Sequence, residues 1–317
     1  MSHVKEAAPT PIVLAFTPNY FVPAATLLCS MLRHSPHSAH FEVICLLTEA
    51  LPEQMQQDLA LFGGERLRFR FINLEGRLQD IYVDPKYTVA AAYRLLLPEL
   101  LPEYDKVLYA DCDMVVQNDL ASLFREVNMG DHYLAGVAEA TLDFQLPHME
   151  VIGCTPGTYI NSGFLIMNLE QLRQDKMVEK FMAAASAAFL LFPDQDVLNQ
   201  LCKGRILYLA PYHNAIRTFY LPQYKQAFLN YYTEQDWQAV QRHGNIHYTG
   251  GKPWKTFTVR FEDWWSYHAQ LPQAIRNRQL ASVGIQVLQW ICRRPIGRLI
   301  IKVPQRMYRK LKGVSCC

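Results

Sequence analysis

The 317-residue sequence lacks several patterns that would place a chain in a specialised class of protein. No pair of cysteines has the Cys-x-x-Cys spacing of a structural zinc site. No apolar run approaches the roughly 18 residues that a membrane-spanning helix needs, and no heptad repeat indicates a coiled coil. With only 15 glycines and 18 prolines, the composition also excludes collagen-like and low-complexity proteins. Half of the residues are apolar, which indicates a globular protein with a large core.

The N-terminal region and the cysteines indicate a cytoplasmic protein. The apolar run at residues 12–16 is too short for the hydrophobic core of a secretion signal. Cys29, Cys45 and Cys112 lie within or beside apolar runs, where thiols behave as small hydrophobic groups. We therefore expect free thiols in a reducing compartment. The roles of Cys316 and Cys317, at the end of the sequence, stay open.

Acidic residues are absent from residues 281–317, where basic residues are frequent. The basic residues of this segment are Arg293, Arg294, Arg298, Lys302, Arg306, Arg309, Lys310 and Lys312. The whole chain has 31 basic and 29 acidic residues, so the remainder carries an acidic excess, which argues against nucleic-acid binding. Side chains such as Trp290, Ile291 and Tyr308 alternate with the cations. This pattern is typical of a segment that binds an anionic membrane surface. A helix packed on the body with a basic outer face is the alternative.

Short apolar runs alternate with helical patterns along the chain. The first predicted strands are residues 12–16, 41–47, 67–72 and 106–110, and the helices among them are 23–33, one beginning near 53, and 89–97. Further strands are predicted at 159–168, 206–209 and 245–248, with helices at 169–187 and 194–202. Strands that are apolar at almost every position are buried on both faces by helices. We predict an α/β fold with an open, mostly parallel, twisted, Rossmann-like sheet.

The composition changes only near the C-terminus, and no linker or internal repeat is evident before it. We therefore expect one α/β domain over residues 1–270 and a basic, amphipathic membrane-association segment over residues 271–317. Ligands of open α/β sheets bind beyond the carboxyl ends of the strands. The residues that follow each predicted strand are therefore the candidate site residues.

The predicted strand 106–110 leads directly into Asp111-Cys112-Asp113. Two carboxylates at positions i and i+2, held where a strand opens into a turn, can converge on one hard cation such as Mg²⁺ or Mn²⁺. The alternative is two acids that solvate a loop, which is common for so short a motif. The fully apolar strand favours the metal site, because it fixes both acids at the edge of the sheet.

A second candidate segment follows the short strand predicted near residue 246. It reads His247-Tyr248-Thr249-Gly250-Gly251-Lys252-Pro253-Trp254. His247 can be a third metal ligand, the glycines let backbone N–H groups approach a phosphate, and Lys252 adds a positive charge. A glycine turn beside a core histidine is the alternative, and the Lys-Pro-Trp sequence argues against it.

Together these segments resemble glycosyltransferase family 8, the retaining nucleotide-sugar transferases with a GT-A fold, and especially its bacterial lipopolysaccharide galactosyl- and glucosyltransferases. The resemblance covers residues 10–268 in order. It implies that Asp111, Asp113 and His247 hold Mn²⁺ against the diphosphate of a UDP-sugar. It also implies that Gly250 and Lys252 contact the phosphates.

Three more segments carry the resemblance. Ala92-Tyr93-Arg94 fits a helix whose arginine contacts the donor sugar, and Asn161-Ser162-Gly163 fits a segment that lines the sugar pocket. Asp194-Gln195-Asp196 fits the segment beside the anomeric carbon. Singly, each has a structural explanation, namely a solvated helix charge, the start of a strand or a helix N-cap. Their shared order along the chain favours the resemblance.

The nucleoside end of the implied site departs from the family pattern, because Thr17 stands where an acid is usual. The resemblance implies a donor-binding set of Thr17, Asn19, Tyr20, Arg94, Asp111, Cys112, Asp113, Asn161, Ser162, Asp194, Gln195, His247, Gly250 and Lys252. The catalytic candidates are Arg94, Asp194, Gln195 and Asp196.

The resemblance implies an enzyme that moves glucose or galactose from a UDP-sugar to a lipid-linked lipopolysaccharide or lipooligosaccharide core. It would work at the inner face of the cytoplasmic membrane. Retention of configuration requires a protein nucleophile or front-face attack, and Gln195 is a poor nucleophile, which favours front-face attack. Two alternatives remain. One is a haloacid-dehalogenase-like phosphatase with Asp111 as nucleophile, although three predicted strands precede this strand, which usually opens that fold. The other is a non-enzymatic, nucleotide-binding peripheral membrane protein.

Overall fold

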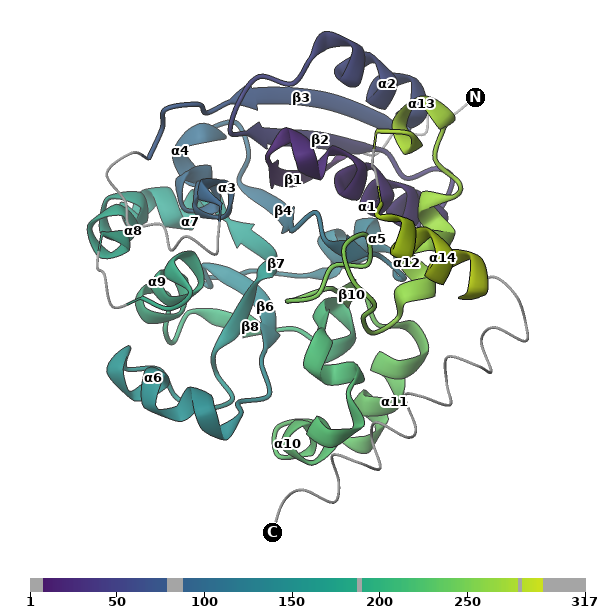
Figure 1. Ribbon diagram of the computed structural model, residues 1–317. Coiled ribbons are helices and arrows are strands. Elements are labelled where there is room, and N and C mark those ends of the chain that lie inside the picture. The colour runs from purple at the N-terminus through teal and green to yellow at the C-terminus, as the bar shows by residue number, and fades with distance from the viewer. Residues whose placement is uncertain (1–7, 79–87, 187–189, 279–280, 293–317) are drawn as a thin grey trace, which may run out of the picture.

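The centre of the protein is a seven-stranded sheet with the strand order β3-β2-β1-β4-β7-β6-β8 (Figure 1). The computed structural model describes residues 8–78, 88–186, 190–278 and 281–292. The strands are β1 (Thr10–Phe16), β2 (Phe41–Leu47), β3 (Leu67–Asn73), β4 (Lys106–Ala110), β6 (Leu134–Ala138), β7 (Ile160–Asn168) and β8 (Ile206–Tyr208). β7 runs antiparallel to both of its neighbours, and the other pairs are parallel. The predicted open, mostly parallel α/β sheet is confirmed.

Helices cover both faces of this sheet, as the continuous apolar strands predicted (Figure 1). Alternate residues of β1 enter opposite cores, since Ile12 and Leu14 join one cluster of buried side chains and Val13 joins the other. The first cluster includes residues of α1 (Phe21–His34) and α12 (Phe261–His268). The second includes residues of α7 (Leu169–Gln174), α8 (Met177–Ala185) and α9 (Pro193–Leu201). Other helices of the described chain are α2 (Glu53–Gly63), α5 (Leu120–Glu126), α6 (Leu146–Val151), α10 (Lys225–Leu229) and α11 (Glu234–His243).

Two predicted helices differ from the observed ones. The helix predicted over 89–97 is α3 (Val89–Ala92), a 3₁₀ turn (Tyr93–Leu96) and α4 (Leu97–Leu100). It was predicted to end before Pro98, but Pro98 lies in the first turn of α4, where a missing N–H breaks no helical bond. The helix predicted over 169–187 is divided at Lys176, whose φ of 50° separates α7 from α8. Residue 187 lies outside the described residues.

The first part of the C-terminal segment 271–317 packs against the body. α13 (Gln273–Arg276) and α14 (Val283–Cys292) bury Ile275, Ile285 and Cys292 in the same cluster as α1. In the parts of the chain that the structure describes, no helix combines the length and apolar character needed to cross a bilayer. The basic residues from Arg293 onward and the two terminal cysteines lie outside the described residues.

Candidate active site

A small second sheet brings the two candidate metal segments together. Its strand order is β5-β10-β9, with β5 (Met114–Val115), β10 (Ile246–His247) and β9 (Ala215–Ile216). β5 begins directly after Asp113, and β10 pairs antiparallel with it so that His247 lies opposite Met114. The backbone N–H of Tyr248 donates to the carbonyl of Asp113 at 3.0 Å. Long-range strand pairing therefore places His247 beside the Asp-x-Asp turn.

Asp111, Asp113 and His247 each offer one ligand atom, and these atoms all lie within 4.8 Å of one another. His247 Nε2 lies 3.3 Å from Asp113 Oδ1 and 3.7 Å from Asp111 Oδ2. Asp113 and His247 are buried, whereas the half-buried Asp111 leaves one side of the cluster open. Two carboxylates and one imidazole with an open side fit a divalent cation that keeps positions for other oxygen ligands. The structure thus brings the three predicted ligands together.

Lys252 reaches this cluster from the loop after β10. Its Nζ binds Asp113 Oδ2 and donates to the carbonyl of Tyr248 at 2.8 Å. Burial alone would raise the pKa of Asp113, but Lys252 and His247 hold it well below its usual range. Burial alone would lower the pKa of Lys252, but the carboxylate of Asp113 raises it. Lys252 is therefore a fixed cation beside the candidate ligands.

Arg94 is a buried cation on the other side of Asp111, with a side chain only 2% exposed. Its Nη2 donates to Asp111 Oδ1 at 2.9 Å, and its Nε lies 3.2 Å from Asp194 Oδ2. The hydroxyl of Tyr109 also donates to Asp111 Oδ1, at 3.0 Å. Burial alone would lower the pKa of Arg94, but the two carboxylates raise it above its ordinary value. Arg94 therefore joins the Asp-x-Asp turn to the Asp194 segment.

The first residues of β7 and α9 form a polar wall next to Arg94. The backbone N–H of Ser162 and the Nδ2 of Asn161 both donate to Gln195 Oε1, at 3.0 and 3.1 Å. The hydroxyl of Ser162 donates to Asp194 Oδ2 at 2.9 Å. All four side chains are buried, and this burial raises the pKa of Asp194. The structure therefore brings together four residues that the sequence placed in two distant segments.

Asp196 lies apart from this wall, although it belongs to the same short segment of sequence. Its side chain is fully buried, and the Tyr159 hydroxyl donates to its Oδ1. Its Oδ2 lies 3.0 Å from His148 Nε2 and accepts the backbone N–H groups of Leu191 and Phe192, each at 3.0 Å. Both carboxylate oxygens are therefore engaged in holding the chain before α9.

The turn after β1 carries the nucleoside-end candidates. Thr17 Oγ1 donates to Asn19 Oδ1, and Tyr20 lies edge-on to the buried ring of Trp254, with ring centroids 5.6 Å apart. Cys112 is buried behind the turn, with its Sγ 3.9 Å from the carbonyl oxygen of Ala15, and burial raises the pKa of its thiol well above the ordinary value.

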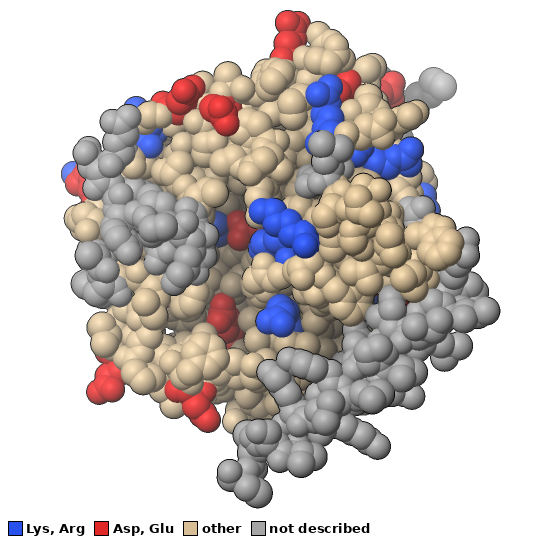
Figure 2. Space-filling model, viewed as in Figure 1, with Lys and Arg blue, Asp and Glu red and all other residues tan. Residues whose placement is uncertain are grey.

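The loop that carries Gly250 and Lys252 is fixed by Trp254. The ring of Trp254 packs between Tyr20 and Trp264, whose centroid is 5.1 Å away. The φ of 87° at Gly250 lies in the left-handed region that favours glycine. Figure 2 shows a hollow in the middle of the face on which β4, β7 and β10 converge in Figure 1, with acidic side chains inside it and basic side chains beside it.

Two residues of this site were not predicted, and the role of a third was not. Glu139 follows β6, a strand that the sequence analysis did not identify, and its Oε1 accepts from Asn161 Nδ2 at 2.9 Å. Asn214 ends a 3₁₀ turn, and its Oδ1 lies 3.0 Å from His247 Nδ1. Gly163 belongs to the predicted sugar-pocket segment, but its absent side chain also leaves room for His247 and Asp111, a role that no spacing rule reveals. Only Glu139 carried a usable signal, an acid directly after an apolar run.

Comparisons with known proteins agree with this arrangement. The chain is 27% identical over 214 residues to general stress protein A of Bacillus subtilis (strain 168), covering 65% of this chain and 72% of that protein. It is 27% identical over 194 residues to lipopolysaccharide 1,2-glucosyltransferase of Escherichia coli (strain K12), covering 58% of this chain and 54% of that protein. Among solved structures, the galactosyltransferase LgtC in complex with donor and acceptor sugar analogues superimposes with a TM-score of 0.68 and 23% identity, covering 85% of this chain and all of that chain.

The bifunctional glycosyltransferase WbbM superimposes with a TM-score of 0.70 and 21% identity, covering 88% of this chain and 53% of that one. The likeness to WbbM and to LgtC confirms the GT-A fold. The family model for glycosyl transferase family 8 matches residues 11–258, which contain both candidate metal segments and the polar wall. This match decides against the phosphatase alternative for Asp111. Because it spans most of the chain, the protein belongs to glycosyl transferase family 8.

Proposed function

We propose that this protein transfers glucose or galactose from a UDP-sugar, with retention of configuration, to a lipid-linked lipopolysaccharide or lipooligosaccharide core. The observation that carries the proposal is the meeting of Asp111, Asp113 and His247 with the fixed cation Lys252. A divalent cation bound by the three ligands would stabilise the charge of a departing diphosphate. The relative from E. coli that is named a lipopolysaccharide 1,2-glucosyltransferase supports the acceptor class.

The ligand set favours Mn²⁺ as the metal. Asp111 and Asp113 supply carboxylate oxygens, which suit both Mg²⁺ and Mn²⁺. The imidazole of His247 is a better ligand for a transition-metal ion than for Mg²⁺, which prefers oxygen ligands. We therefore expect Mn²⁺ to support more activity than Mg²⁺.

Different residues of the site would bind the diphosphate and the hexose of the donor. Lys252 would neutralise charge on the diphosphate. Asp194 and Asn161 of the polar wall, together with the neighbouring Arg94, would hold the hexose hydroxyls. Such positioning is a large part of glycosyl transfer, because it replaces a chance encounter by a fixed geometry.

Front-face attack fits the observed geometry better than a double displacement. The amide oxygen of Gln195 already accepts from Asn161 and Ser162 and is a weak nucleophile. Both oxygens of Asp196 are engaged by Tyr159, His148 and backbone N–H groups, so we propose that Asp196 positions α9 and Gln195 rather than reacting.

The proposed activity is tested by UDP release from UDP-glucose and UDP-galactose in the presence of Mn²⁺. We expect release from one of the two donors, its loss on adding EDTA, and its recovery when Mn²⁺ is restored. Asp113→Asn should remove at least about 99% of it, since one ligand and the partner of Lys252 are lost together. Asp131→Asn, at an exposed surface acid, is the matched control and should keep full activity. Consumption of neither donor would contradict the proposal.

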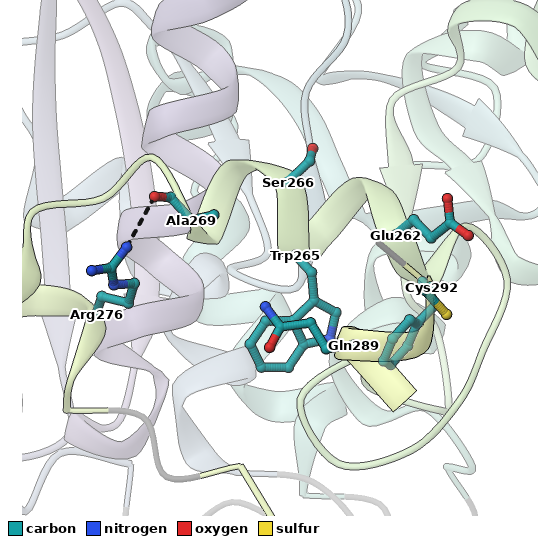
Figure 3. A pocket seen from close by; sticks show the side chains of 8 residues that line it. Glu262, Trp265, Ser266, Ala269, Arg276, Gln289 and Cys292 are labelled. Carbon is teal, nitrogen blue, oxygen red and sulfur yellow. Dashed lines mark hydrogen bonds between the residues drawn. The ribbon is translucent and has the colours of Figure 1, made fainter. Parts of the chain in front are cut away.

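The C-terminal segment is proposed to bind an anionic membrane surface. α14 exposes Val283, Val287 and Trp290, which lie on one face at helical spacing, and the chain continues from Cys292 into the basic residues. A pocket of about 380 Å³ lies beneath α14, with walls that include Trp265 of α12 and Cys292 (Figure 3). Because α14 forms part of the wall of this pocket, we propose that the boundary between the catalytic domain and the membrane-association segment lies after Cys292.

Truncation after Cys292 should release the protein from membranes without stopping donor hydrolysis. It removes all eight basic residues of the segment, each of which contributes about 1 kcal/mol near an anionic surface. The measurement is co-sedimentation with vesicles that contain phosphatidylglycerol, with phosphatidylcholine vesicles as the control. Full-length protein should bind only the anionic vesicles, and less at high salt. Equal binding by the truncated chain would refute the membrane role, and loss of donor hydrolysis would mean that the segment is structural.

A further inference from the structure

We infer that Asn214 is a positioning residue that keeps the proton of His247 on Nδ1 and so leaves Nε2 free to bind a cation. This inference rests on the proposed metal site. Asn214 is fully buried at the end of a 3₁₀ turn, Pro211–Asn214. Its Oδ1 lies 3.0 Å from His247 Nδ1, and its Nδ2 lies 2.9 Å from Asn161 Oδ1. Asn214 therefore connects the candidate metal ligand to the polar wall.

The orientation of the Asn161 amide is determined by groups that cannot be reversed. The backbone N–H of Gly163 donates to Asn161 Oδ1 at 3.1 Å, and a backbone N–H is only a donor. On the other side, Asn161 Nδ2 lies 2.9 Å from a carboxylate oxygen of Glu139, which is only an acceptor. If the Asn161 amide were reversed, Nδ2 would face the N–H of Gly163, donor against donor. Oδ1 would then face the carboxylate of Glu139, acceptor against acceptor. Its Oδ1 must therefore face Asn214.

The amide of Asn214 is then determined in turn. Because Asn161 presents an oxygen, Asn214 must present Nδ2 to it and turn Oδ1 towards His247. An oxygen at 3.0 Å from His247 Nδ1 requires a hydrogen on that nitrogen. The neutral imidazole consequently carries its proton on Nδ1, and the lone pair of Nε2 faces Asp111 and Asp113.

The hydrogen bonds from Asn161 through Asn214 to His247 favour a proton on Nδ1, whereas the neighbouring carboxylates favour one on Nε2. Without a metal, the carboxylates of Asp113 and Asp111, 3.3 and 3.7 Å from His247 Nε2, would favour a proton on Nε2. A proton there would have to leave before a cation could bind. Glu139 and Gly163, acting through two amides, hold the imidazole in the tautomer that a metal ligand needs.

The two hydrogen bonds of Asn214, to His247 and to Asn161, also explain why position 214 is an asparagine. Metal-binding histidines are usually oriented by a carboxylate or a backbone carbonyl. A carboxylate at position 214 could accept from His247 Nδ1, but it could not donate to Asn161 Oδ1. Asn214→Asp should therefore preserve the tautomer of His247, whereas Asn214→Leu should lose it.

The tautomer can be measured directly in the metal-free, full-length protein by ¹⁵N NMR of labelled histidines. At about pH 9, where an ordinary imidazole is neutral, we expect His247 to show a protonated Nδ1 and an unprotonated Nε2. Its signals are assigned by their absence from His247→Gln. Asn214→Leu should move the proton to Nε2, and Asn214→Asp should leave it on Nδ1. A wild-type protein with the proton on Nε2 overturns the inference, whether or not the variants fold.

Mn²⁺ affinity, measured by electron paramagnetic resonance, is the second readout. Asn214→Leu should lose about 10- to 100-fold in affinity, the usual cost of removing a partner of a metal-binding histidine, and Asn214→Asp should stay close to wild type. Asn199→Leu removes another buried asparagine, which binds the backbone of Ile160, and should lower the melting temperature without changing the tautomer or the affinity. Equal affinities in wild type and Asn214→Leu would overturn the role of Asn214. A wild-type protein with the expected tautomer but no Mn²⁺ binding would instead refute the proposed metal site.

Discussion

Replacing Gly163 with alanine is expected to reduce both Mn²⁺ affinity and UDP release by at least about 100-fold, because small displacements of reacting groups have effects of this size. An added Cβ would overlap His247 Cε1 and lie 2.6 Å from Asp111 Oδ2, so it would push two proposed ligands apart. The backbone cannot withdraw to make room, because the carbonyl of Gly163 accepts the N–H of Asp111 at 2.8 Å and β7 pairs with β4. Equilibrium Mn²⁺ binding and the donor assay measure the effect.

Gly136→Ala is the matched control for this substitution. Gly136 lies in β6 next to β7, and an added Cβ would meet side-chain atoms of Leu165 and Ile160 at 3.0 and 3.1 Å. This variant should lose stability through overpacking, by about 1–3 kcal/mol, but should bind Mn²⁺ as the wild type does. If Gly163→Ala also kept normal Mn²⁺ affinity, the Asp-Asp-His cluster would not be the metal site.

Replacing Arg94 with methionine is expected to lower the free energy of unfolding by about 3–5 kcal/mol, the usual cost of leaving a buried ion pair with one partner. The guanidinium is almost completely buried and is the common partner of Asp111 and Asp194. Methionine would replace the bulk of the side chain without its charge. Urea unfolding at pH 7 measures the loss as a shift of the midpoint at constant slope.

The pH dependence of Arg94→Met separates lost charge from lost packing. Burial already raises the pKa of Asp194 in the wild-type protein, and Arg94 opposes this rise, so the pKa of Asp194 should rise further in the folded variant. A raised folded pKa adds stability as the carboxyl group becomes protonated, so the deficit should shrink as the pH falls towards about 4. A deficit that is independent of pH would attribute the effect to packing alone.

Arg205→Met provides the comparison at the surface. Arg205 pairs with Asp175 at 2.8 Å, and its guanidinium lies over the ring of Tyr133, but both charged side chains are about a third exposed. Solvent screens such a pair, so the loss should be no more than about 1 kcal/mol. If both substitutions, Arg94→Met and Arg205→Met, lowered the free energy of unfolding equally, burial would not determine how much each ion pair contributes to stability.

Local patterns were sufficient to predict most of the sheet. β1, β2, β3 and β4 are found within two residues of the predicted strands. β1, β2 and β4 are apolar at most positions and buried on both sides, whereas the edge strand β3 alternates apolar residues with Arg68 and Arg70. β6 was missed because its five residues include Gly136 and two alanines, which are depleted in strands. Both helices at 89–97 and 169–187 were predicted, but their divisions near Tyr93 and at Lys176 were not, because a change in backbone direction leaves no mark in hydrophobic periodicity.

The sequence by itself determined the chemistry available at the site, namely paired aspartates after a buried strand, a late histidine, and a lysine after two glycines. It could not separate Gln195 from Asp196, which are adjacent in the chain but point to different faces of α9, because consecutive helical residues do not share a face. Only the tertiary structure decided that His247 meets Asp111 and Asp113, through the pairing of β5 with β10. Apolar runs and periodicity can be read from residues that are neighbours in the chain. The contacts between the polar groups of this site depend instead on strand pairing across more than a hundred residues of intervening chain.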